Sequence, residues 1–170
     1  MPEVMVDLET MGNESDAAII AIGAVIFDNS GVKDKFYEVV NLVSSVKNGG
    51  VISPSTVLWW MKQSESARKE FERPGIYINE ALIKFSSFVP PKSHVWGNGS
   101  DFDNIILKSA YEKSVYDLPW KFWDNRCYRT MKNMFKIAFP PIEGAHNALI
   151  DAEYQANHLI HICQTVGIVL

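Results

Sequence analysis

The segment VMVDLET, residues 4–10, decides the architecture that the sequence predicts. Its apolar residues alternate with two acids, Asp7 and Glu9, and side chains at i and i+2 of a strand point to the same face. The two carboxylates therefore project together, roughly 6–7 Å apart along the strand, while Val6 and Leu8 face the core. Like charges placed in this way repel one another unless a cation lies between them. The plain alternative is a pair of solvated acids on an edge strand.

Outward from this segment, the sequence predicts a three-strand meander and then alternating helices and strands. The further strands are expected over about 17–27, 33–40, 94–96 and 121–126. Helices are expected over about 55–72, 79–88, 101–113, 127–137 and 147–165, and a loop over 44–53. This order indicates an α/β fold, with a mixed five-stranded sheet and helices on both faces. No repeat or linker divides residues 1–170, so a single domain is expected.

The composition excludes several classes of protein. The 170 residues are 47% hydrophobic and 21% charged, which argues against a disordered chain, a collagen-like repeat and a disulfide scaffold. The longest uncharged apolar stretch, about 17–27, is too short to span a membrane. No basic leader opens the chain, and its two cysteines, Cys127 and Cys163, are expected to be reduced. We therefore expect a cytoplasmic protein with no membrane contact.

A second acidic motif, WGNGSDFD at residues 96–103, stands where a central strand is expected to end. Glycines turn the chain there, Ser100 or Asp101 is the expected helix cap, and Phe102 is expected to face the core. Open α/β sheets hold their sites at the carboxyl ends of such strands, so Asp103 is a candidate ligand. Favourable placement at a helix N-terminus would explain the same acid equally well.

The third motif is HNALID, residues 146–151. Asp151 falls within an otherwise apolar helix, where a carboxylate is costly unless it is paired or bound to a metal. Side chains five positions apart on a helix point in directions that differ by roughly 140°. His146 and Asp151 would therefore not share a helix face. We expect His146 in the loop before the helix, free to turn toward the site. The alternative is a histidine at a helix start and a buried aspartate paired with a lysine.

Taken together, the three motifs make the chain resemble the DEDDh 3′–5′ exonucleases of the DnaQ-like, ribonuclease H-like superfamily. The resemblance is carried by residues 7–10, by Asn98 with Phe102 and Asp103, and by residues 146–152, and it extends from Val4 to about Ile162. Within that superfamily the chain is most similar to small phage-type and bacterial exonucleases, including relatives of RNase AS. The segments that carry this closer similarity are residues 58–60, 96–99 and 119–123.

This resemblance implies that Asp7, Glu9, Asp103 and Asp151 hold two Mg²⁺ or Mn²⁺ ions. Asp7 would bridge the ions, with Glu9 and Asp151 on the first and Asp103 mainly on the second. His146 would take the proton from the attacking water. The implied reaction removes nucleoside 5′-monophosphates from a free 3′ end of single-stranded DNA or RNA. A ribonuclease H-like endonuclease and a non-catalytic nucleic-acid-binding module are the alternatives.

Seven further residues are candidate substrate contacts. By resemblance, Thr10 and Met11 lie beside the terminal nucleotide. Asn98 is a separate candidate, expected to bond the sugar or to orient a ligand. Trp59 and Trp60 are roughly 100° apart on a helix, so one is expected in the core and the other is free to stack on a base. The remaining two candidates are basic, namely Arg126 and Arg129. The other tryptophans are expected in the core, namely Trp96, Trp120 and Trp123.

The net charge of −4 does not argue against a nucleic-acid substrate. Four of the twenty acids are candidate metal ligands, which leaves sixteen acids against sixteen basic residues. Five basic residues between 121 and 136, Arg126 and Arg129 among them, form either a phosphate track or a solvated helix face. The choice between RNA and DNA as the substrate stays open, because no motif indicates a contact with the 2′-hydroxyl group of RNA. A homodimer is expected from related enzymes.

Overall fold

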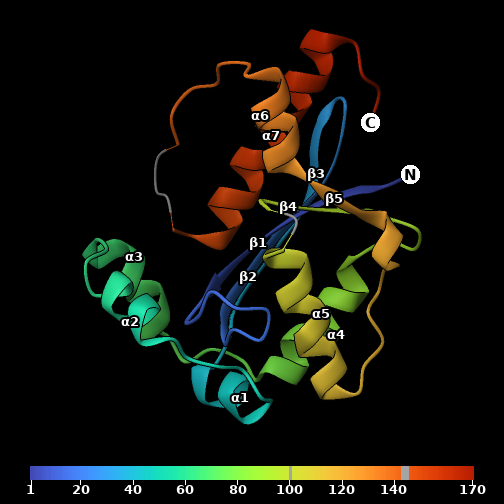
Figure 1. Ribbon diagram of the computed structural model, residues 1–170. Helices are drawn as coiled ribbons and strands as arrows, with labels where there is room; N and C mark the ends of the chain where they lie inside the picture. The colour runs from blue at the N-terminus through green and yellow to red at the C-terminus, as the bar shows by residue number, and fades with distance from the viewer. Residues whose placement is uncertain (100, 143–145) are drawn as a thin grey trace.

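The structure of the chain is a computed structural model that describes residues 1–99, 101–142 and 146–170. Its centre is a mixed five-stranded sheet in the order β3-β2-β1-β4-β5 (Figure 1). The strands are β1 (Glu3–Thr10), β2 (Ile19–Asp28), β3 (Gly31–Val39), β4 (His94–Gly97) and β5 (Asn125–Cys127). The first three are antiparallel neighbours, whereas β1, β4 and β5 run parallel. The predicted α/β fold with a mixed five-stranded sheet is confirmed.

Helices cover both faces of the sheet, as predicted. One face packs against α4 (Ile78–Phe88) and α5 (Asp103–Ser114), and the other against α6 (Tyr128–Phe135) and α7 (Ala148–Val166) (Figure 1). The remaining elements are α1 (Leu42–Lys47), α2 (Pro54–Trp60), α3 (Glu65–Lys69), η1 (Glu70–Glu72) and η2 (Phe122–Asp124). No helix of the described residues is long and apolar enough to cross a bilayer.

Strand β1 is the central strand and is buried on both of its faces. Val4, Val6 and Leu8 pack into the core shared with α4 and α5, whereas Met5 packs into the core shared with α6 and α7. The expectation that Val6 and Leu8 face a core is therefore correct. Asp7 lies on the opposite face from them, two residues beyond Met5 and under the start of α7.

The segment between β3 and α4 differs from its expected structure. The region 44–53, expected as a loop, overlaps α1. Asn41 caps the first turn of this helix, since its Oδ1 accepts a hydrogen bond from the backbone N–H of Ser44 at 2.9 Å. The helix expected over 55–72 is divided into α2, α3 and η1. Both errors have one cause, because short helices contain too few turns to show a periodic pattern.

Two boundaries further along the chain also differ from the expectation. Helix α5 begins at Asp103 with Phe102 as its N-cap, so Asp101 does not cap it, and Ser100 lies outside the described residues. The strand expected over 121–126 is a short turn of helix, η2, followed by β5. The later start of α5 places Asp103, rather than Asp101, in the first turn of that helix.

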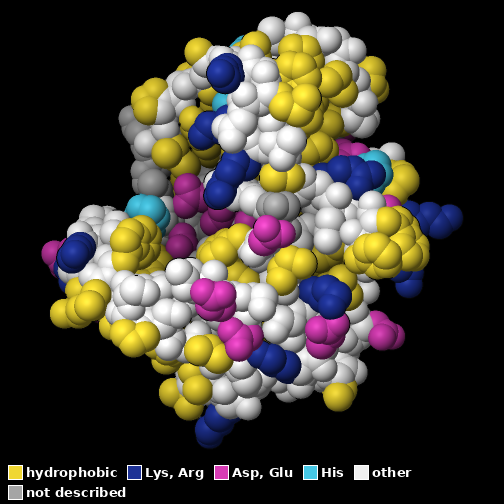
Figure 2. All heavy atoms as spheres, in the orientation of Figure 1, with side chains coloured by type: hydrophobic (Ala, Val, Ile, Leu, Met, Phe, Trp, Pro, Cys, Tyr) yellow, Lys and Arg dark blue, Asp and Glu magenta, His cyan; other side chains and the backbone are white. Residues whose placement is uncertain are grey.

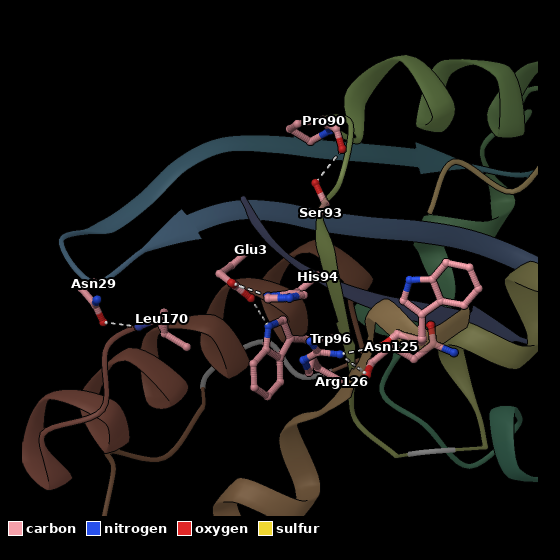
Figure 3. Close-up of polar contacts among 10 residues, drawn as sticks. Glu3, Asn29, Pro90, Ser93, His94, Trp96, Asn125, Arg126 and Leu170 are labelled. Carbon is pink, nitrogen blue, oxygen red and sulfur yellow. Dashed lines mark hydrogen bonds and ion pairs between the residues drawn. The ribbon is translucent and has the colours of Figure 1, made fainter. Parts of the chain in front are cut away.

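The amino end of β1 is tied to β4 by a buried polar group. Glu3 accepts hydrogen bonds from Trp96 Nε1 at 2.6 Å and from His94 Nδ1 at 2.7 Å (Figure 3). Glu3 and His94 are direct partners in the parallel ladder, and Met5 pairs with Trp96. The register of β1 against β4 is therefore fixed by side chains as well as by the backbone.

Candidate active site

The candidate site forms at the carboxyl end of β1, where its neighbour β4 stops. The β1–β4 ladder ends at the pair Met5–Trp96, so the later backbone groups of β1 need other partners on that side. Asp103 supplies one, because its Oδ1 accepts from the backbone N–H of Leu8 at 3.1 Å. Its Oδ2 accepts from the N–H of Asn98 at 2.9 Å. The Asp103 carboxylate is thereby fixed beside β1.

Glycines at two positions leave room for the close contacts of α5 and α7 with the sheet. A Cβ at Gly97 would lie 3.1 Å from Asp103 Oδ2 and even closer to the side chain of Asn104. Gly23 stands opposite Asp7 on β2, and a Cβ there would come within 2.1 Å of the backbone of Ala148. The first turn of α7 therefore rests directly on β2 beside Asp7.

Helix α7 brings Asp151 to the site in its first turn. Asn147 caps the helix, since its Oδ1 accepts from the backbone N–H groups of Leu149 and Ile150, each at 3.2 Å. His146 precedes this cap, outside the helix as predicted, and has a left-handed backbone with φ of 69°. Its N–H donates to Asp151 Oδ2 at 2.8 Å. The loop and the helix thus position one another through the acid.

The imidazole of His146 packs against a tryptophan that lines the same site. The ring centroids of His146 and Trp59 are 4.9 Å apart with the planes at 90°. One ligand atom from each of Glu9, His146 and Asp151 lies within 4.8 Å of the other two. The sequence predicted that His146 would reach the acids, but it gave no sign of the contact with Trp59.

A cavity of about 530 Å³ joins these groups. Figure 2 shows acidic side chains gathered in a hollow of the surface, with a histidine at its edge. The candidate residues that line the cavity are Asp7, Glu9, Thr10, Trp59, Trp60, Asn98, His146 and Asp151. Asp103 lies just behind the wall, where it is 2% exposed and bonded to Leu8, a lining residue.

The carboxylates of the site are buried close to one another, which makes their charged forms costly. Burial raises the pKa of Asp7 well above its usual range, and the charges of Asp103, Glu9 and Asp151 raise it further. Burial, with the charges of Asp151 and Asp103, raises the pKa of Glu9 to about 8. Each carboxylate therefore favours a bound proton or a bound cation over a free charge.

The other two acids carry raised pKa values that neighbouring donors partly offset. Burial raises the pKa of Asp103 to about 6, although the backbone N–H groups of Asn98 and Leu8 and the guanidinium of Arg129 act in the opposite direction. Burial also raises the pKa of Asp151, against hydrogen bonds from the backbone of His146 and Asn147.

The donor set fits hard divalent ions. Four carboxylates and one imidazole converge, and among the described residues both cysteines, Cys127 and Cys163, are free thiols outside the cavity lining. Oxygen-rich sites of this kind suit Mg²⁺ or Mn²⁺ rather than soft metals. Such ions would also offset the repulsion that contributes to the raised pKa values of Asp7 and Glu9.

Sequence reasoning missed Gln155, which lines the cavity and donates from Nε2 to Asp7 Oδ1 at 2.7 Å. The available signal was its position four residues after Asp151, because residues four apart share one face of a helix. The side chain is 4% exposed, so this polar group is part of the interior.

The two adjacent tryptophans divide as predicted. Trp60 is 5% exposed and donates from Nε1 to the carbonyl of Thr10 at 2.9 Å, whereas Trp59 is 42% exposed. Met11 packs behind them, partly buried against Trp60, and does not line the cavity.

Among the other tryptophans expected in the core, Trp96 and Trp120 are buried, but for Trp123 the expectation is wrong. Trp123 is 62% exposed and packs edge-on against Phe122, which is 67% exposed, with a centroid distance of 4.9 Å. The sequence could not separate these cases, because residues 122–124 form a single 3-10 turn at the sheet edge.

Of the two candidate arginines, only Arg129 lies near the acids. An ideal Cβ at Gly99 would lie 3.6 Å from the guanidinium carbon of Arg129, and the charge of Arg129 acts on Asp103. Arg126 instead donates from Nη1 to the carbonyl of Trp123 at 3.0 Å and to that of Asn125 at 2.9 Å. Figure 3 shows Arg126 beside Asn125. Neither arginine lines the cavity.

A ribonuclease H-like sheet with buried acids at the end of its central strand and a histidine beside them defines a class of nuclease, the DEDDh exonucleases. The model of the 3′-5′ exoribonuclease Rv2179c-like domain family matches residues 2–163. The chain belongs to this family and is a hydrolytic 3′–5′ exonuclease.

Comparison with individual proteins agrees with this assignment. An exodeoxyribonuclease of Enterobacteria phage T4 is 30% identical, over 76% of this chain and 70% of the phage protein. The nuclease domain of 3′hExo, a DEDDh family member solved bound to rAMP, is 14% identical with a TM-score of 0.66, covering 99% of this chain and 94% of that one.

A further structure, E. coli Exonuclease I in complex with a dT13 oligonucleotide, has a TM-score of 0.65 at 16% identity. The match covers 97% of this chain but only 40% of that one. At these identities the two solved structures establish the fold, and the ribonuclease H-like architecture that the sequence predicted is confirmed.

Proposed function

We propose that this protein is a two-metal-ion 3′–5′ exonuclease that acts on single-stranded or frayed 3′ ends and releases nucleoside 5′-monophosphates. The observation that carries the proposal is the convergence of four carboxylates from β1, α5 and α7, of which Asp7, Glu9 and Asp151 line one cavity and Asp103 lies just behind its wall. They are held there with raised pKa values. A buried cluster of this kind is costly for the fold, and a bound cation offsets that cost while the carboxylates stay charged.

In this proposal Asp7, Glu9, Asp103 and Asp151 hold two Mg²⁺ or Mn²⁺ ions. The ions, when bound, supply the positive charge that activates water and stabilises the leaving oxygen. His146 accepts the proton of the attacking water, for which its place among Glu9 and Asp151 is suitable. The edge contact with Trp59 limits the rotation of the imidazole and keeps it turned toward the cavity.

The terminal nucleotide is proposed to occupy the cavity. Trp59 offers a half-exposed ring for stacking, and Thr10 and Asn98 offer polar groups at the wall. Trp60 acts behind them by holding the carbonyl of Thr10. Arg129, exposed near Asp103, is placed to receive a phosphate, and this part of the proposal favours the phosphate track over a solvated face.

Met11 and Arg126 have weaker support as substrate contacts, because Met11 packs against Trp60 and Arg126 is bonded to backbone carbonyls. They stay in the proposal as residues whose effect on substrate affinity is smaller than that of Trp59. A single exonuclease domain over residues 1–170, a cytoplasmic location and a homodimer also belong to the proposal. Light scattering that returned the monomer mass of 19.2 kDa would remove the homodimer.

The test is a time course with Mn²⁺ on matched 5′-labelled single-stranded RNA and DNA. We expect a ladder that shortens by one nucleotide at a time from the 3′ end, and its loss with EDTA and in Asp7→Asn. The faster substrate identifies the nucleic acid, on which the family description and the phage relative differ. Longer internal fragments would overturn the exonuclease proposal in favour of an endonuclease.

A pair of matched variants tests the stacking contact. Trp59→Ala should raise the KM for an oligonucleotide by about tenfold, in line with the ~1–3 kcal/mol that stacking of one base contributes. Trp123→Ala removes another exposed tryptophan that lies outside the cavity lining, and it should leave KM unchanged. Equal effects of the two substitutions would contradict the stacking role of Trp59.

A further inference from the structure

Gln155 is held in an unusual environment for an uncharged residue. It lies on α7 one turn after Asp151, lines the cavity and is 4% exposed. Its Nε2 donates to Asp7 Oδ1 at 2.7 Å, a bond between residues 148 positions apart in the chain. A hydrogen bond from a neutral donor to a carboxylate is short and strong, and it restricts the carboxylate to one orientation.

The other end of the same amide is unpaired. Two buried side-chain atoms have no hydrogen-bond partner among the described residues, Asn104 Oδ1 and Gln155 Oε1, and of the two residues only Gln155 lines the cavity. Buried polar atoms are nearly always paired, so an acceptor left open beside a cavity indicates a donor that is supplied from outside the chain. The cavity of about 530 Å³ has room for such a donor.

We propose that Gln155 is a positioning residue of the metal site, in which Nε2 orients the carboxylate of Asp7 and Oε1 accepts a hydrogen bond from the hydration water of a bound divalent ion. This inference rests on the proposed function. It assigns a role to both polar atoms of the Gln155 side chain, and it explains why a glutamine is buried beside four acids. An apolar residue of the same size would leave Asp7 without this donor.

The expected consequence is a loss of metal affinity. Residues that orient the ligands of a metal typically contribute about 10–100-fold to metal affinity. Gln155→Met keeps the length of the side chain and removes both polar ends, so it should weaken Mn²⁺ binding by about 10–100-fold. Gln155→Asn keeps the amide but is one methylene shorter, cannot reach Asp7 from the same backbone, and should show a similar loss.

The experiment is calorimetric titration of Mn²⁺ into the metal-free 170-residue chain, for the wild type and each variant. Gln164→Met is the matched control, because Gln164 is on the same helix and donates to the carbonyl of Asn29 at 2.8 Å, at an exposed position. It should bind Mn²⁺ as the wild type does. Circular dichroism of each metal-free variant establishes that it is folded before the titration.

A second readout separates positioning from substrate contact. For the Gln155 variants, the Mn²⁺ concentration that gives half-maximal activity should rise about 10–100-fold, while the KM for the oligonucleotide at saturating Mn²⁺ stays constant. A raised KM with unchanged Mn²⁺ affinity would overturn the inference. Folded Gln155 variants that bind Mn²⁺ as tightly as the wild type would also overturn it and leave the proposed function standing, whereas a wild type without Mn²⁺ binding would overturn the proposed function itself.

Discussion

Strand β1 buries one glutamate near each of its ends, and the two are held in opposite ways. Glu3 is 2% exposed and Glu9 is 7% exposed. Glu3 accepts hydrogen bonds from Trp96 Nε1 and His94 Nδ1, both on β4 (Figure 3). Glu9 has no such donors among the residues that the structure describes, and burial, with the negative charges of Asp151 and Asp103, raises its pKa to about 8. Both ends of β1 therefore bury an acid, but Glu3 is surrounded by hydrogen-bond donors and Glu9 by other acids.

The length of β4 accounts for this difference. Where β4 pairs with β1, its side chains supply donors to Glu3. Beyond the end of β4, the space beside β1 is occupied by Asp103 and by the cavity. A buried acid with donors stabilises the fold, whereas a buried acid among other acids is stabilised by a cation that binds later.

The largest effect expected from this contrast is that of Glu9→Gln on activity. Removing one carboxylate of the cluster should lower kcat by about 10³-fold, equivalent to roughly 4 kcal/mol. The same substitution should raise the thermal stability of the metal-free protein at neutral pH, because an amide needs no proton on folding, whereas Glu9 with its raised pKa must bind one. Gel assays on a 5′-labelled oligonucleotide and a thermal melt with EDTA measure the two effects. A variant that is inactive because it is unfolded would show a lowered melting temperature instead.

The next effect concerns pH and the metal-free protein. The pKa of Glu9 is about 8 in the folded chain and 4.5 as its ordinary value, so between these values the folded state holds a proton that the unfolded state has lost. The free energy of unfolding should therefore fall as the pH rises from about 5 to about 8, by a few kcal/mol. Asp103, with its pKa raised to about 6, contributes in the same direction.

Urea denaturation with EDTA across this pH range measures that slope. Glu9→Gln should make the slope shallower, since one of the titrating groups is gone while Asp103 remains. Saturating Mg²⁺ should reverse it, because a metal binds the deprotonated carboxylates and is favoured as the pH rises. A metal-free stability that increased from pH 5 to pH 8 would contradict a raised pKa at Glu9.

Glu3→Gln tests the other end of the strand. The amide keeps one acceptor oxygen and replaces the other with an N–H₂ group, so the charge-assisted hydrogen bonds from Trp96 and His94 are lost, and one donor must turn away or, at His94, change tautomer. The expected cost is about 1–3 kcal/mol of stability, with kcat nearly unchanged because Glu3 does not line the cavity. Urea denaturation and the gel assay measure both, and a loss of activity in the folded variant would show that the two ends are coupled.

The sequence predicted those parts of the site that depend on local periodicity. The alternation in β1 was enough to place Asp7 and Glu9 on one face, and the rotation of a helix was enough to place His146 outside α7. Contacts between distant segments were not predictable in this way. The bond of Gln155 to Asp7 and the place of Asp103 beside Leu8 depend on pairings across 148 and 95 residues. The donors of Glu3 were likewise missed.

His94→Ala gives the smallest effect and the finest test of the comparison. It removes one of the two donors of Glu3, but Trp96 remains, and the side chain of His94 is 22% exposed, so water can replace it. The expected cost is about 0.5–1.5 kcal/mol, less than that of Glu3→Gln. If His94 acts through Glu3, the double variant should cost less than the sum of the two single variants, since neighbouring groups are not additive. Strict additivity in urea denaturation would mean that His94 stabilises the fold by its own packing, and that Glu3 is satisfied by Trp96 alone.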